Sequence, residues 1–445
     1  MNESPIDVRD WIDKQKINSY QYYVLLLGFL IIFIDGYDTA VMGFIIPSLN
    51  HQWQLTPGHA GLILGSAMFG VALGAIAAGG LADRFGRKKI LLSALGLVSA
   101  MSLAGAFSAS PVQLATFRFL AGLGLGAVMP VCVTLVAEYV PSRRKSTAMT
   151  AMYSGFSLGS GGAGVLAAWM LQHYHWGSLL LIGGIIPAAL LIILLVTLHE
   201  SPMYLWRRAT DHKRLCSVLN RIGGRFNYAT LSIREYPSLN NKSTFSALFS
   251  EGYGKKTVVL WLTYLFGLFT IYLLNGWMPN TLNEGGFSLT QTAWVASGFQ
   301  LGGIAGCLII GYLMDKTSAA KMVSVFYLIG ATILFAAFVL DKQFMTLLIL
   351  IFLSGIFING AQTGMQSIAP TTYPTSFRAT GVSCMHGVGR IGAITSSSLG
   401  GMLLFIFPGE SSLYCFLATS ALIASMLIIN LNTTIQPVAE RQISK

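Results

Sequence analysis

The sequence predicts an all-α integral membrane protein with twelve transmembrane helices in two pseudo-repeats of six. The prediction rests on composition, on the number of apolar segments and on an internal similarity between the halves. Of the 445 residues, 54% are hydrophobic and only 10% are charged. Soluble domains carry about 25% charged residues, so this composition indicates a chain that crosses a bilayer several times.

Twelve apolar segments are long enough to cross the hydrocarbon core as helices. A polar stretch separates the first six from the last six, which predicts an N-terminal bundle (1–198), a cytoplasmic linker (199–255) and a C-terminal bundle (256–445). The predicted segments are 22–49, 60–82, 90–108, 112–137, 146–170, 178–198, 256–280, 290–313, 321–340, 343–368, 378–407 and 411–431.

The basic residues fall on one side of the predicted membrane. All but three of the 28 Lys and Arg residues lie in the termini or loops of that side, the exceptions being Lys342, Arg118 and Arg390. Cytoplasmic loops collect positive charge, so both termini and the linker are expected in the cytoplasm. The linker is expected to lie along the inner face as short amphipathic helices. Topology accounts for the net charge of +11, and nucleic-acid binding is not needed to explain it.

The two halves resemble each other at three places. "GGLADRFGRKK" from Gly79 is similar to "GYLMDKTSAAK" from Gly311, "RFLAG" to "IFLSG", and "YVPSRR" to "YPTSFR". Parallel repeats of this kind enclose a central site near the bilayer midplane. Arg118 aligns with Ile351, so its charge belongs to one half and indicates a substrate or ion site.

The stretch "IDGYDTAVMG" places two carboxylates, Asp35 and Asp38, in the first span. A charge at the bilayer centre costs about 2.5–3.5 kcal/mol on insertion scales. Residues three apart share one face of a helix, and two carboxylates in a low dielectric repel. One of them is expected to take up a proton, which predicts a proton-coupling device. The alternative is that both carboxylates cap backbone groups where the helix breaks at Gly36.

Two arginines and a histidine lie inside other predicted spans. A rise of about 1.5 Å per residue places Arg118 and Arg390 in the same outer layer as Asp35 and Asp38. Arg118 stays charged, so it pairs with an aspartate or holds a substrate carboxylate in a bidentate fork. Arg390 is the other candidate anchor, unless both arginines only stabilise the bundle. His386 lies four residues before Arg390 and is a candidate proton relay or a packing residue.

Several motifs resemble a known family. "GGLADRFGRKK" is similar to the loop between helices 2 and 3 of the major facilitator superfamily, and "DGYD" resembles the hallmark of its aromatic acid:proton symporter branch. "HESPMYL" and "LNGWMPNTL" also fit that branch, whereas "MDKTSAAK" lacks the expected G-R-K ending. The resemblance covers nearly the whole chain. It implies uptake of a benzoate-like acid with protons across a bacterial inner membrane by alternating access.

An aromatic carboxylate needs flat apolar walls and a few polar contacts. The candidate walls and the amides that would bind ring hydroxyls are Tyr37, Tyr272, Trp277 and Phe299, with Asn275, Gln300, Gln362 and Gln366.

The loop motif also supplies candidate gating residues, which lock one conformation during rocking unless they serve topology alone. In the first half they are Gly79, Asp83, Arg84, Gly86, Arg87, Glu138 and Arg144, and in the second half Asp315 and Arg378.

The sequence contains no HExxH or Walker motif, so we expect neither an enzyme nor an ATP-driven pump. We expect no metal, no cofactor beyond the proton gradient and no obligatory protein partner; the expected partners are a small aromatic carboxylate, protons and the lipid bilayer. Two alternatives stay open. One is a proton symporter of the same fold for muconate, a phenylpropanoid or a sugar. The other is a transporter-like sensor that binds solute without moving it.

Overall fold

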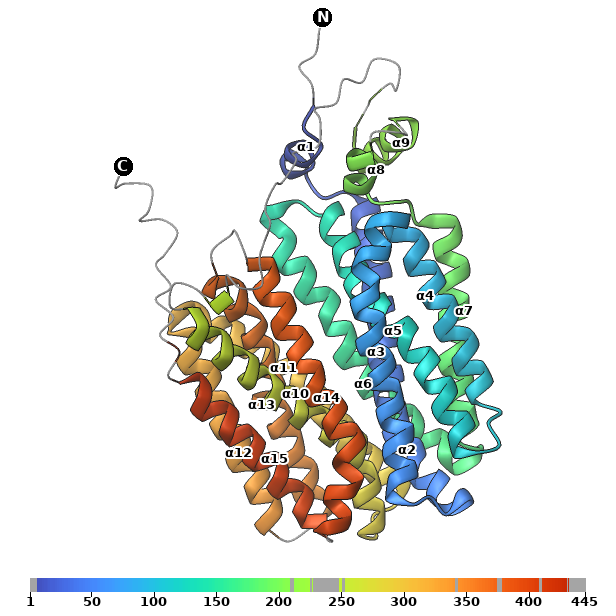
Figure 1. Ribbon diagram of the computed structural model, residues 1–445, viewed down its shortest axis with the longest axis vertical. Coiled ribbons are helices and arrows are strands. Elements are labelled where there is room, and N and C mark those ends of the chain that lie inside the picture. Colours follow the sequence, from blue (N-terminus) through green and yellow to red (C-terminus); the bar gives the residue numbers. More distant parts are fainter. Residues whose placement is uncertain are drawn as a thin grey trace, which may run out of the picture. The chain divides into compact units, whose positions relative to one another are not determined.

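A computed structural model describes residues 6–208, 212–224, 226, 248–249, 253–340, 343–373, 378–407, 410–429 and 431. The described part is almost entirely helical, and each of the twelve predicted segments coincides with one helix (Figure 1). The predicted fold class is therefore confirmed.

Nine of the described helices are long and apolar enough to cross a membrane. Three other helices coincide with predicted spans but fall outside that set. Two of them, α6 (Lys145–His173) and α14 (Arg378–Ile406), are long but contain many Gly and Ser residues, which lower their hydropathy. The third, α15 (Glu410–Ile428), has a shorter apolar segment over Ser412–Ile428. Small residues let helices approach closely, so α6 and α14 suit packing inside a bundle.

The chain divides into two compact units. Unit 1 comprises Met1–Met42, Gln52–Leu55 and Leu62–Asn240. Unit 2 comprises Gly43–His51, Thr56–Gly61 and Asn241–Lys445. The boundaries predicted at 198 and 256 stay a prediction.

The long helices of unit 1 come from the first half of the chain, although the ends of two of them group with unit 2. They are α2 (Ser19–Trp53), α3 (Pro57–Phe85), α4 (Arg87–Gly105), α5 (Pro111–Tyr139), α6 and α7 (Gly177–Thr197).

Glycines bring α2 and α6 into close contact. A Cβ at Gly36 would overlap the carbonyl oxygen of Phe156, and one at Gly159 would overlap that of Phe33. Helix α2 runs unbroken through "DGYD". The alternative in which the helix breaks at Gly36 is therefore wrong, and this glycine serves close helix packing instead.

Three short helices form a cap over one end of unit 1 (Figure 1): α1 (Val8–Lys14), α8 (Pro202–Arg208) and α9 (His212–Ile222). The prediction of short helices in the linker is confirmed for α8 and α9, and α9 is amphipathic. Its Leu215, Leu219 and Ile222 belong to the same buried cluster as Val8 and Ile12. The apolar face of α9 therefore contributes to the buried core of unit 1, and the expectation that the linker lies along the inner face of the membrane stays a prediction.

The long helices of unit 2 pack as three neighbouring pairs, α10 with α14, α11 with α13 and α12 with α15. Small residues again make the close approaches, since a Cβ at Gly306 would overlap the carbonyl oxygen of Ile356. Helices α14 and α15 are joined in this unit by α10 (Tyr253–Glu284), α11 (Leu289–Lys316), α12 (Ala319–Val339) and α13 (Phe344–Thr372).

Candidate substrate and proton site

The centre of unit 1 contains a buried ion pair between Arg118 on α5 and Asp38 on α2. Arg118 Nη1 lies 2.8 Å from Asp38 Oδ1, and Nη2 lies 2.6 Å from Oδ2. Nη2 also donates to the Asp38 backbone carbonyl at 3.3 Å. The two residues are only 2% and 1% exposed. The guanidinium therefore holds the carboxylate in a bidentate fork, the geometry that fits any carboxylate ligand of this size.

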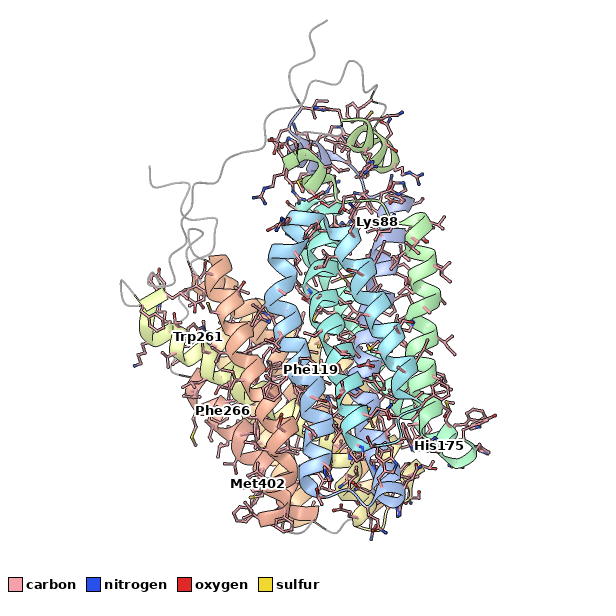
Figure 2. All side chains as sticks on the ribbon, turned by 45° about the vertical axis from the view of Figure 1, so that its right-hand side comes forward. Lys88, Phe119, His175, Trp261, Phe266 and Met402 are labelled. Carbon is pink, nitrogen blue, oxygen red and sulfur yellow. The ribbon has the colours of Figure 1, made fainter. Side chains whose placement is uncertain are left out.

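Figure 2 helps to place this pair along the unit. It shows Lys88 and His175 toward opposite ends of unit 1, with Phe119 between them. Phe119 follows Arg118 directly in the chain, so the ion pair lies in the middle part of the helices. The sequence-based depth estimate for Arg118 and Asp38 is consistent with their contact.

Asp35 lies one turn before Asp38 and is 7% exposed. Because α2 is continuous here, the two carboxylates lie on neighbouring positions of one helix face. The two carboxylates and the Arg118 guanidinium are thus buried in unit 1. The proton-coupling role of either aspartate stays a prediction.

Tyr37, between the two aspartates, is already engaged in helix packing. Its hydroxyl donates to the Leu179 carbonyl oxygen on α7 at 2.9 Å, and the residue is 5% exposed. The hydroxyl is thus occupied inside unit 1, and the role of the ring as an aromatic wall stays a prediction.

In unit 2, two tyrosines of α10 contact the two predicted basic residues of α14. Arg390 donates to the Tyr272 hydroxyl at 3.3 Å, and the Tyr264 hydroxyl is hydrogen-bonded to His386 Nδ1 at 3.2 Å. Arg390 and His386 therefore face the same neighbouring helix, as their spacing of four predicted. Tyr264 was missed by sequence analysis, because one tyrosine among many aromatic residues gives no signal.

The predicted amide residues of unit 2 are mostly buried and partly paired. Gln300 donates to Asn275 at 2.8 Å, and the Tyr327 hydroxyl donates to Gln362 Oε1 at 2.6 Å. Gln366, one turn further along α13, is half-buried. These contacts hold three of the four predicted amides in defined orientations.

Two of the three predicted aromatic walls in unit 2, Trp277 and Phe299, are buried, and Tyr272 is half-buried. The Trp277 indole donates to the Ser397 carbonyl oxygen at 3.1 Å, and Phe299 is fully buried. The indole nitrogen of Trp277 is therefore used within the unit. The wall roles of all three residues stay predictions.

The predicted gating loop forms a charge cluster at the capped end of unit 1. Arg87 lies 3.0 Å from Asp83 and 3.3 Å from Glu138, so one guanidinium joins α3, α4 and α5. Arg207 of α8 lies 3.8 Å from Asp83. The Glu138 carboxylate also accepts a hydrogen bond from the Ser201 hydroxyl. The cluster thus ties the loop to the start of the linker.

Gly86 makes the turn between α3 and α4. Its φ of +103° lies in the region that favours glycine. A Cβ here would also overlap the carboxylate of Glu200. That carboxylate accepts from the Lys88 backbone N–H at 3.0 Å, where it satisfies an otherwise free donor at the start of α4. Sequence analysis missed Glu200 and Ser201 as gate partners, although both lie in the "HESPMYL" motif.

The remaining gating candidates have weaker contacts or lie outside the description. The Arg84 guanidinium lies over the Phe85 ring at 5.2 Å, and Arg144 is exposed in the turn before α6. Gly79 is exposed on α3. The side chains of Asp315 and Arg378 lie outside the described part of the structure.

The surroundings of His199, at the capped end of unit 1, lower its pKa. His199 Nδ1 is hydrogen-bonded to the Tyr20 hydroxyl at 3.0 Å. Burial, followed by the positive charges of Arg221 and Lys88, lowers the pKa of His199 below its ordinary value. Neutral His199 is therefore favoured in the folded protein.

Within the described ranges, no group of three or more His, Cys, Asp or Glu side chains could hold a metal ion.

Comparison with known proteins identifies the family. The sequence matches the Major Facilitator Superfamily over residues 28–279 and 260–444. It is 42% identical over 427 residues to a gallate transporter of Pseudomonas putida, covering 96% of this chain and 95% of the relative. It is 40% identical over 401 residues to a 4-hydroxybenzoate transporter of the same species, covering 90% of each.

The solved structures give the same fold. The xylose transporter of E. coli matches with a TM-score of 0.71 at 16% identity, covering 92% of this chain and 96% of that one. The family match and the two bacterial relatives confirm the resemblance that the loop and "DGYD" motifs indicate. They identify a membrane transporter rather than an enzyme. The chain belongs to the Major Facilitator Superfamily, within its aromatic acid:proton symporter branch.

Proposed function

We propose that this protein takes up a hydroxylated aromatic carboxylate together with a proton, by alternating access. The relatives that match along nearly the whole chain are named for the transport of gallate and 4-hydroxybenzoate. The observation that carries the proposal is the buried bidentate ion pair of Arg118 and Asp38. It supplies both a carboxylate-binding fork and a titratable partner for it.

The pair couples proton to substrate by competition for one guanidinium. With Asp38 ionised, its two oxygens fill the fork of Arg118. Protonation of Asp38 removes that charge, and the substrate carboxylate takes its place on Arg118. The charge of the buried guanidinium is balanced in both states, which matters because an unpaired charge in this environment is costly. Asp35, one turn away, is the second proton-coupling residue.

Unit 2 has its own candidate residues for substrate and proton. Arg390, oriented by Tyr272, is the second candidate for holding the carboxylate, and His386 is the candidate proton relay. The cluster of Arg87, Asp83 and Glu138 acts as the gate at the capped end of unit 1.

The same proposal includes the location of the protein and its driving force. The protein lies in the bacterial inner membrane with both termini in the cytoplasm, as its basic loops favour. Its driving force is the proton gradient, without a cofactor or an obligatory protein partner.

Purified protein in liposomes tests the proposal. Under an imposed pH gradient, acid outside, labelled 4-hydroxybenzoate and 3,4,5-trihydroxybenzoate are expected to accumulate. Muconate, a phenylpropanoid and xylose form the comparison panel. Dissipating the gradient with a protonophore should reduce accumulation to equilibration. Accumulation of xylose alone would overturn the proposed substrate class, and binding without accumulation would indicate a sensor.

A further inference from the structure

An amide group inside unit 2 is held in one orientation by a tyrosine. The Tyr327 hydroxyl on α12 donates to Gln362 Oε1 on α13 at 2.6 Å. Tyr327 is fully buried and Gln362 is 5% exposed. Because the amide oxygen accepts this bond, the Gln362 Nε2 group points away from Tyr327 with both of its hydrogens available.

A third helix leaves space for this pair. A Cβ at Gly267 on α10 would overlap both Gln362 Oε1 and the Tyr327 hydroxyl. Any side chain at position 267 would therefore displace the bond. The backbones of α10, α12 and α13 meet around one oriented amide.

The Gln362 Nε2 atom is buried and has no hydrogen-bond partner among the described residues. Buried polar groups in native proteins are nearly always paired, so an oriented donor without a partner needs an explanation. Asn275 repeats the pattern: its Oδ1 accepts from Gln300 Nε2, and its Nδ2 is likewise buried and unpaired within the described structure. Two described amides of unit 2 thus have their oxygen bonded and their nitrogen buried without a partner.

We propose that Gln362 Nε2 donates a hydrogen bond to a hydroxyl oxygen on the ring of the transported acid and thereby selects hydroxylated over unsubstituted rings. This inference rests on the proposed function and deepens it. A phenolic oxygen accepts the bond, whereas benzoate leaves the donor buried and unpaired. Sites built to bind a hydroxyl discriminate strongly against analogues that lack it, for this reason. Tyr327 is a positioning residue that fixes the amide.

The experiment compares transport of four probes into liposomes: benzoate, 3-hydroxybenzoate, 4-hydroxybenzoate and 3,4,5-trihydroxybenzoate. The measured quantity is the ratio of kcat/KM for each hydroxylated probe to that for benzoate. Gln362→Leu is expected to lower the ratio for the preferred hydroxylated probe by about tenfold or more, while benzoate uptake is retained. Gln362→Glu, which replaces the donor by an acceptor, should lower it as far.

Two further variants separate recognition from packing. Tyr327→Phe keeps the amide but frees its orientation, so it should lower the ratio less than Gln362→Leu does. The double variant Gln362→Leu/Tyr327→Phe removes both hydrogen-bonding partners, which protects the fold and should reproduce the Gln362→Leu ratio. Ser354→Ala is the control, because Ser354 is buried on the same helix and its hydroxyl donates to the Ile351 carbonyl oxygen of its own helix.

The outcomes are distinct. An unchanged ratio in Gln362→Glu and the double variant would overturn the inference, as would an equal loss for all four probes, which indicates a structural role such as holding an ordered water. Failure of the wild-type protein to accumulate any of the probes would instead overturn the proposed function.

Discussion

Arg118 on α5 holds both carboxylate oxygens of Asp38 on α2, at 2.8 and 2.6 Å, in the buried middle part of unit 1. Such a pair is a weak source of stability when intact but a large source of instability when one partner is removed. This asymmetry gives two separable predictions, one on folding and one on transport.

Arg118→Ala should destabilise the protein by about 3–5 kcal/mol, because Asp38 is then buried without a counter-charge. Adding Asp38→Asn removes that charge and should restore much of the thermal stability in detergent. The double variant should still fail to accumulate substrate. Recovery of transport together with stability would contradict the assignment of Arg118 as a carboxylate anchor.

Arg118→Lys keeps the charge and loses the planar fork. We expect a rise in KM for 4-hydroxybenzoate of about tenfold, since a charged, bidentate contact becomes a point contact. Arg9→Lys, on the cap, is the matched control. Equal KM values in both variants would exclude bidentate binding at Arg118.

Asp35→Asn and Asp38→Asn should each abolish accumulation driven by a pH gradient, because neither amide can carry the proton. Both variants should still insert into the membrane. Abundance should stay near the wild-type level for Asp35→Asn, whereas Asp38→Asn leaves Arg118 without its counter-charge and should also lower thermal stability. Asp10→Asn, at an exposed position of α1, controls for the loss of one carboxylate. Normal accumulation in both Asp35→Asn and Asp38→Asn would show that neither aspartate is needed for proton coupling.

Gly86→Ala should destabilise the protein by about 1–2 kcal/mol, because alanine strains at positive φ and its Cβ overlaps the Glu200 carboxylate. Gly79→Ala is the matched control. Gly79 is helical and a Cβ there meets nothing within 4 Å, so this change should be neutral or stabilising. Thermal unfolding of both variants in detergent gives the comparison, and equal effects would argue against the strained turn.

His199 predicts a pH effect of defined sign. Its pKa is lowered in the folded protein, chiefly by burial, so the unfolded chain binds a proton more readily. The contribution of neutral His199 to stability is present above the ordinary pKa of about 6.5 and is lost as the pH falls below it. His199→Gln should therefore show a smaller loss of thermal stability between pH 7 and pH 5 than the wild type. A steeper loss in the variant would contradict this sign.

The helices were predictable because a span needs a long apolar segment, a property of the sequence alone. Depth was predictable in the same way, and it placed Arg118 at the level of Asp38. The rotation of each helix about its own axis was not predictable from the sequence, because it depends on how the helix surfaces pack against one another. The contact of Tyr327 with Gln362, and of α9 with the core of unit 1, therefore required the structure.

The structural role of the glycines was the hardest feature to predict from the sequence. One alternative from the sequence was a helix break at Gly36, whereas in the structure this glycine brings α2 against the backbone of α6. Both uses favour glycine for its missing side chain, and only the neighbouring helix distinguishes them. The contact of Glu200 was not predictable either, because its partner is the backbone N–H of Lys88, which no sequence pattern identifies.

The central claim is that protonation of Asp38 frees Arg118 to bind the substrate carboxylate, so that proton and carboxylate are carried together. The direct test measures proton and 4-hydroxybenzoate entry together, using a trapped pH dye and labelled substrate in liposomes. One proton should enter with each carboxylate, and a membrane potential imposed without a pH gradient should not drive uptake. Uptake without proton entry, or uptake driven by the potential alone, would contradict the account.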